Sequence, residues 1–179
     1  MSVELPDDEA VWGRWLEAVA RPEIDAGILA LHAAMDDAVA ARGPTCWQSG
    51  KCCHFDAYGH RLYVTGLEAA WFVQRRGTAP PPADAPTGHA VLPILERPPA
   101  AAHPGCPFQV DHRCTVHADR PLGCRVFFCQ AGTEAWQADL YDRYHAAMRR
   151  LHDAHGVPYR YLEWRAALDQ AAQASASAA

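Results

Sequence analysis

The sequence lacks any apolar run long enough to cross a membrane and any leader-like segment. Its N-terminal stretch, MSVELPDDEAVW, is acidic and contains no apolar core, unlike a secretory signal. No segment approaches the ~18 consecutive apolar residues of a membrane-spanning helix. We therefore expect a soluble cytoplasmic protein with no membrane partner. A reducing cytosol disfavours structural disulfides, so metal or redox roles become more plausible for its cysteines.

The chain also lacks a strong charge imbalance and the common catalytic motifs. Its net charge is −5 with both signs spread along the sequence, which gives no support for binding nucleic acid or anionic membranes. GxSxG, GxGxxG and P-loop patterns are absent, as are internal repeats of 20–50 residues. No carboxylate pair can be placed in an acid–base site, and the sequence identifies no protein partner.

Apolar spacing predicts helices at both ends of a single domain. With 179 residues, half of them apolar, the chain can bury one sizeable core. Residues 1–43 and 131–172 each contain two helical stripes, and residues 173–179 are expected to fray. We expect these helices to pack together and present the cysteine loops from one end. The stripes are Val11, Trp12, Trp15, Leu16 and Val19; Ile24, Ile28, Leu31, Met35 and Val39; Trp136, Leu140, Tyr144, Ala147, Met148 and Leu151; and Tyr161, Trp164 and Leu168.

Residues 44–130 form the cysteine-cluster region, where turn residues interrupt short elements. A strand is predicted around 61–64, and Thr65-Gly66-Leu67-Glu68 fits a capping box that opens a helix. Residues 108–116 fit a small hairpin around Asp111-His112. Residues 77–105 are rich in Pro and Ala and predict an irregular loop with an apolar piece at 91–95. The predicted fold class is mainly α with a small β-hairpin and a loop-rich metal-binding region.

Seven cysteines fall in two tight clusters, CWQSGKCC and CPFQVDHRCTVHADRPLGCRVFFC, and none lies elsewhere. Thiolates are soft ligands that favour zinc, copper(I) or iron–sulfur clusters. An odd number of thiols cannot all pair within one chain. We predict that the two clusters meet in space and hold a metal centre. The candidate ligands are Cys46, Cys52, Cys53, Cys106, Cys114, Cys124 and Cys129.

Spacing alone does not choose among these ligands. The Cys46–Cys52 and Cys124–Cys129 intervals lower the entropic cost of convergence, but neither motif has the paired CxxC spacing of a zinc ribbon. Adjacent Cys52 and Cys53 do not easily point at one centre from an extended backbone. Either one of them ligates while the other packs, or the two serve different ions.

Other residues of the two motifs are candidates for supporting roles. Imidazoles are ligands for zinc and iron, and basic side chains near a thiolate cluster offset its charge and lower thiol pKa values. The candidate histidines are His54, His112 and His117; the basic residues are Lys51, Arg120 and Arg125; the acceptors for supporting hydrogen bonds are Asp56 and Glu68.

The residues between the cysteines carry a family resemblance. CPF, RCTVH and RPLGCRVFFC closely resemble the second half of the YkgJ-like cysteine-cluster family, which is described as a zinc- or iron-chelating domain. CWQSGKCC resembles its CxxCxxCC motif, with Ser49 where many relatives carry another cysteine. His117 stands where a tyrosine is common. The resemblance spans Cys46 to Cys129 and implies metal binding through these cysteines.

A similar cysteine pattern occurs in the flagellin lysine methylase family, which resembles an iron–sulfur methyl-transfer system. This resemblance makes a [4Fe–4S] cluster a candidate beside zinc. Three functions therefore stay open: a metal-binding protein with a structural or metal-handling centre, an iron–sulfur enzyme such as a methyl transferase, and a metal-free thiol–disulfide protein. Ser49 leaves enough thiols for one four-thiolate site with spares.

Overall fold

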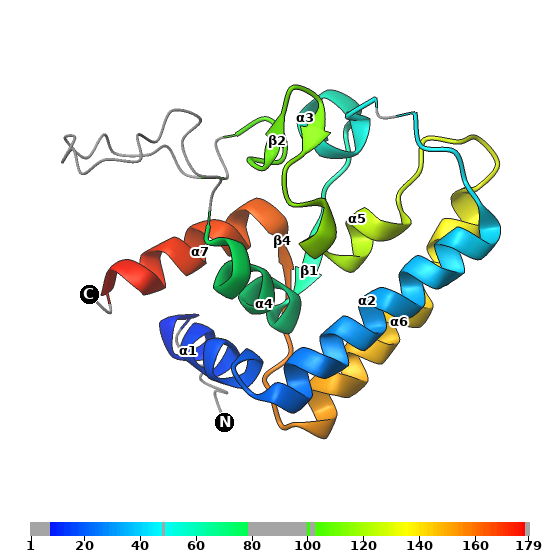
Figure 1. Ribbon diagram of the computed structural model, residues 1–179. Helices are drawn as coiled ribbons and strands as arrows, with labels where there is room; N and C mark the ends of the chain where they lie inside the picture. The colour runs from blue at the N-terminus through cyan, green and yellow to red at the C-terminus, as the bar shows by residue number, and fades with distance from the viewer. Residues whose placement is uncertain (1–7, 48, 79–99, 101–102, 178–179) are drawn as a thin grey trace, which may run out of the picture.

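The computed structural model describes residues 8–47, 49–78, 100 and 103–177, with side chains described as far as Ser175. The apolar piece predicted at 91–95 lies outside this part of the chain. Within it the fold is mainly helical, as predicted, with short antiparallel strand pairs (Figure 1). The helices are α1 (Asp8–Val19), α2 (Pro22–Arg42), α3 (Phe55–Tyr58), α4 (Gly66–Arg76), α5 (Leu122–Val126), α6 (Glu134–Ala154) and α7 (Trp164–Ser177). The strands are β1 (Tyr63–Thr65), β2 (Gln109–Val110), β3 (Arg113–Cys114) and β4 (Tyr161–Glu163).

The terminal helices pack against one another and form the scaffold of the domain. Helices α2 and α6 lie side by side in Figure 1, and α1 contacts α4 and α7. Pro22 occupies the first turn of α2, and Gly43, with φ of +64°, ends that helix while donating its N–H to Val39. The segments that carry cysteines gather around one pocket, as predicted, and in Figure 1 they lie above α1 and the first turns of α2.

Aromatic residues dominate the core between α1, α4 and α7. Trp12, Trp15, Trp71 and Trp164 are each at most 1% exposed. A Cβ placed on Gly66 would lie 2.2 Å from the Trp15 ring, so α4 begins against the ring only because this position has no side chain. Burial of rings of this size supplies much of the hydrophobic stabilisation of a small domain.

The predicted capping box starts α4. The Thr65 hydroxyl accepts from the Glu68 N–H, and a Glu68 carboxylate oxygen accepts from the Thr65 N–H at 2.9 Å. The second Glu68 oxygen accepts from the Leu122 N–H at 3.0 Å, which ties the start of α5 to the start of α4. Glu68 is 3% exposed, and burial raises the pKa of its carboxyl group. Its role is therefore to hold two helix N-termini together.

The prediction for the C-terminal segment was wrong at both of its ends. Tyr161, assigned to the last helix, lies in β4, which pairs antiparallel with β1 in the register Thr65↔Tyr161. The helix begins only at Trp164, whose N–H donates to Leu62 at 2.8 Å. The tail expected to fray from residue 173 is helical as far as Ser177. Three residues are too few to show the alternation of apolar and polar side chains that marks a strand. The strand forms because it pairs with β1, about a hundred residues earlier in the sequence.

The predicted hairpin is present as β2 and β3, with Gln109 opposite Cys114 and Val110 opposite Arg113. Its turn consists of Asp111 and His112, with φ of +48° and +63°. Both residues therefore adopt the left-handed conformation of a type I′ turn, which matches the twist of paired strands. The hairpin carries Cys114 and presents His112 at its tip.

Among the helices of the described ranges, none combines the length and apolar character that a membrane crossing needs.

Buried His152 couples the stability of the fold to pH. Its Nε2 atom accepts from the Leu67 N–H at 3.3 Å, and its Nδ1 atom lies 3.1 Å from the Pro158 carbonyl. Burial lowers the pKa of His152 from 6.5 to about 4. His32, which lies between Trp71 and Arg125, is held neutral in the same way, with burial as the main cause of a pKa of about 3.

We predict that the free energy of unfolding falls as pH drops from about 6.5 to 4. The unfolded chain then takes up a proton that folded His152 rejects, so its stabilisation is complete above pH 6.5 and is lost below it. The loss attributable to His152 is about 3 kcal/mol, because each unit by which the folded pKa lies below the unfolded pKa corresponds to ~1.4 kcal/mol. Urea unfolding followed by circular dichroism should show a shallower decline for His152→Gln, whose amide retains both a donor and an acceptor. An equally steep decline in the variant would contradict this assignment.

Candidate metal centre

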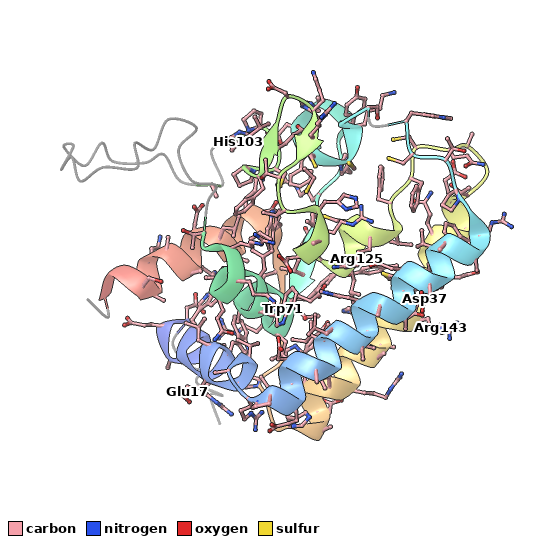
Figure 2. All side chains as sticks on the ribbon, in the orientation of Figure 1. Glu17, Asp37, Trp71, His103, Arg125 and Arg143 are labelled. Atoms are coloured by element: carbon pink, nitrogen blue, oxygen red, sulfur yellow. The ribbon has the colours of Figure 1, made fainter. Side chains whose placement is uncertain are left out.

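All seven cysteines line one pocket of about 670 Å³, so the two sequence motifs meet in space as predicted. The thiols come from five segments: the loop after α2, the 3-10 turn Lys51–Cys53, the turn at Cys106, the β2–β3 hairpin, and the segment that runs from Arg120 through α5 to Cys129. In the orientation of Figure 2 these segments lie above α2 and α6. Phe72 of α4 and Trp164 of α7 also line the pocket. The described lining residues include seven thiols but no Asp or Glu, which is the donor chemistry of soft metals rather than Mg²⁺ or Ca²⁺.

A backbone contact brings the two motifs together at the floor of the pocket. The Cys106 N–H donates to the Cys53 carbonyl at 2.7 Å, and both side chains are buried. A Cβ on Gly105 would lie 2.2 Å from that carbonyl oxygen, so this approach requires a glycine. The chain can therefore place Cys53 beside Cys106 although 52 residues separate them in the sequence.

Cys52 and Cys53 both line this pocket, and the extended backbone that would separate neighbouring side chains is not present here. Gly50, with φ of +71°, turns the chain into a 3-10 turn rather than an extended strand. In that conformation the two sulfur atoms lie 3.9 Å apart, and both residues line the pocket. The tight turn removes the alternation of side chains on which the expectation rested.

The thiols of Cys52, Cys53 and Cys106 have unequal acidities. Hydrogen bonding to Cys106, and then to Cys52, raises the pKa of Cys53. The same Cys53 thiol is the main cause that lowers the pKa of Cys52 to about 6 and lowers that of Cys106. Cys53 thus acts as a proton donor between two sulfurs that favour the thiolate form.

Five thiols are close enough to influence one another, and we call them the inner thiols. Burial raises the pKa of Cys114 and raises that of Cys124 well above its ordinary value, and the charges of Cys106 and Cys52 add to both effects. Charged thiolates in this apolar setting need a compensating cation. The inner thiols are Cys52, Cys53, Cys106, Cys114 and Cys124.

The remaining two cysteines, Cys46 and Cys129, line the same pocket, and we call them the outer thiols. The Cys46 residue is exposed, and the Cys129 sulfur lies 3.6 Å from the Ser49 hydroxyl oxygen. Ser49 therefore lines the pocket beside a cysteine, at the position where many members of the resembled family carry another cysteine.

Of the basic residues, only Arg120 has the predicted placement beside the thiols. It lines the pocket and contributes to lowering the pKa of Cys52, and its buried Nε atom has no hydrogen-bond partner among the described residues. Arg125 instead lies between α5 and α2 (Figure 2), where it donates to Asp36 at 2.6 Å and to the Arg120 carbonyl at 2.9 Å. The Lys51 ammonium lies 5.3 Å from the centre of the Tyr58 ring.

The other polar candidates are divided between the pocket and the scaffold. His112 and His117 line the pocket, and a ring nitrogen of His54 lies beside one of His112. Asp56 pairs with Arg165 at 3.3 Å, and Glu68 joins α4 to α5, so both carboxylates stabilise the scaffold.

Trp164 is a pocket residue that sequence reasoning assigned only to a core stripe. Its buried Nε1 atom has no partner at hydrogen-bond distance within the described residues, and its N–H acts at longer range on Cys106, whose pKa it helps to lower. No local signal marks this role, because Trp164 lies far from both motifs in the sequence. An unpartnered N–H that faces a sulfur fits a site built for a charged thiolate.

Within the residues that the structure describes, no three His, Cys, Asp or Glu side chains are arranged closely enough to hold an ion as they stand. The seven thiols share one pocket without forming such a group. The chain matches no protein-family model, no curated protein and no solved structure.

We predict that Gly105→Ala disrupts the pocket floor. The added methyl group meets the Cys53 carbonyl, and overpacking of this kind costs about 1–3 kcal/mol. Urea unfolding should show the loss, and alkylation followed by mass spectrometry should show faster modification of Cys53 and Cys106. Gly13→Ala is the matched control, because a Cβ on Gly13 meets nothing within 4 Å. Equal stability of the two variants would show that the close approach at Gly105 is unimportant.

Proposed function

We propose that this protein binds metal through cysteines of both motifs, with zinc or iron as the ion and a structural or metal-handling role. One observation carries the proposal: thiols from Cys46 to Cys129 all line the same pocket, although they lie on five separate segments of the chain. Chance burial of small apolar side chains does not account for seven of seven thiols around a single space. The resemblance of both motifs to the YkgJ-like family supports the same proposal.

The inner thiols are the best candidates for the primary ligands. They are mutually close, and the lowered pKa values of Cys52 and Cys106 favour the thiolate form that metals require. A four-thiolate zinc site carries a formal charge of −2, which the Arg120 guanidinium that lines the pocket would partly offset. Metal binding would release the protons of the buried thiols and replace them with a cation.

The size of the pocket favours more than a single ion. At ~30 Å³ per water molecule, about 670 Å³ corresponds to roughly twenty waters, far more than one tetrahedral ion needs. The extra space and the outer thiols support the second candidate function, an iron–sulfur enzyme for group transfer such as methyl transfer. Such an enzyme needs a cluster with a nearby space for its substrate.

Purification without oxygen, followed by elemental analysis and ultraviolet–visible spectroscopy, tests the proposal. We expect at least one equivalent of zinc, or iron with the brown absorbance near ~400 nm of an iron–sulfur cluster. Cys106→Ser should lose most of the metal, whereas Cys46→Ser should retain more, because Cys46 is an exposed outer thiol. Ser49→Ala is the control for a pocket substitution that removes no thiol. Metal-free protein with full function and exchanging disulfides would instead support a thiol–disulfide role.

A structural role makes a separate prediction about chelation. Structural zinc contributes ~10–16 kcal/mol to folding in small domains, so removing the metal should unfold the cysteine region. We expect a large fall in melting temperature after treatment with a strong chelator, reversed when the metal is restored. If circular dichroism and the melting temperature stay unchanged while the metal is lost, the centre serves metal handling or catalysis instead.

A further inference from the structure

Two histidines from different motifs meet at the edge of the thiol pocket. The Nε2 atom of His54 lies 3.3 Å from the Nδ1 atom of His112, and the ring centres are 5.4 Å apart with the planes tilted by 46°. His54 follows Cys53 directly, whereas His112 lies at the tip of the β2–β3 hairpin and also lines the pocket. No sequence pattern pairs them, because they lie 58 positions apart in the chain.

Their separation is also that of two ligands of one ion. In the metal-free protein the two neutral rings share a hydrogen bond at this distance, with one ring nitrogen as donor and the other as acceptor. Two imidazole nitrogens bound to one tetrahedral zinc ion at ~2.0–2.1 Å are about 3.3–3.4 Å apart. The observed 3.3 Å equals the lower end of that range.

The backbone under His112 gives a second, independent observation. His112 occupies the second central position of a type I′ turn, where glycine is favoured because φ is positive. Its φ of +63° lies in the left-handed region, which His tolerates better than most residues with a side chain, so this turn presents an imidazole beside the pocket. The hairpin is also fixed in place, since the Gln109 side-chain amide donates to the Gly50 carbonyl at 2.9 Å.

We propose that His54 and His112 form a second metal site, which captures a divalent ion of the zinc class and passes it to the inner thiols. This role rests on the proposed function of the pocket. No third His, Cys, Asp or Glu joins the pair among the described residues, so water would complete the coordination. Two ligands hold an ion weakly and release it readily, as transfer to a thiolate site requires. The ion keeps its charge in transfer: two nitrogen–metal bonds break, sulfur–metal bonds form, and each newly bound thiol gives its proton to solvent.

The site itself is tested on full-length protein whose thiol centre is already filled, with Zn²⁺ alone as the probe. Calorimetric titration should detect a further weak equivalent, and two-bond ¹H–¹⁵N spectra of the imidazoles should show shifts of His54 and His112 together. His112→Gly removes the ring but supplies the residue that the turn prefers, so it should fold normally while its affinity for this ion falls at least tenfold. His54→Asn should do the same, whereas His155→Asn, far along the chain at the end of α6, should bind as the wild type does. Unchanged binding in His112→Gly would overturn the site.

The transfer role is tested by the rate at which metal-free protein fills its thiols. With cobalt(II) as the probe, the sulfur-to-metal absorbance should rise several-fold more slowly in His112→Gly, with the same final stoichiometry as the wild type. An unchanged rate would overturn the transfer role. A failure of the proposed function gives a different result. In that case cobalt(II) would produce no sulfur-to-metal absorbance in any variant, while calorimetry could still detect Zn²⁺ bound by the two imidazoles.

Discussion

Two backbone hydrogen bonds hold the thiol pocket together. The Cys106 N–H donates to the Cys53 carbonyl at 2.7 Å, and the Asp56 N–H donates to the Pro104 carbonyl at 2.9 Å. They join the second cysteine motif to the first at a point where Gly105 leaves no room for a side chain. Buried backbone groups need partners, so this contact also satisfies polar atoms that water cannot reach. The placement of Cys106 beside Cys52 and Cys53, and with it the uneven acidity of these thiols, depends on this junction.

The remaining wall of the pocket is fixed by two buried ionisable side chains of the scaffold. Glu68 accepts the N–H that begins α5, and Arg125 connects the end of α5 to Asp36 on α2. Cys124 lies between these two anchors on the same short helix. Charged groups are retained in a protein interior only where hydrogen bonds and opposite charges compensate their desolvation. Five residues are too few for a helix to be stable alone, so α5 takes its position from these contacts.

The proposed functions divide this end of the molecule between two kinds of ligand. The inner thiols line an apolar, sulfur-rich pocket in which a metal would bind tightly, and Arg113 and Arg120 line the same pocket. The imidazoles of His54 and His112 form an exposed rim where an ion would exchange with solvent. A gradient from weak nitrogen ligands to strong sulfur ligands gives a physical direction to metal uptake.

The sequence by itself determined the helical stripes, the capping box at Thr65, the hairpin turn at Asp111-His112 and the choice of thiols as the chemical group, because each is set by residues close together in the chain. It did not reveal β4, the part of Trp164 in the pocket, the separate roles of Arg120 and Arg125, or the meeting of His54 with His112. These depend on contacts between segments about sixty to a hundred residues apart. Tertiary structure alone decided them, because steric fit at Gly105 and burial under the core, rather than local propensity, bring those segments together.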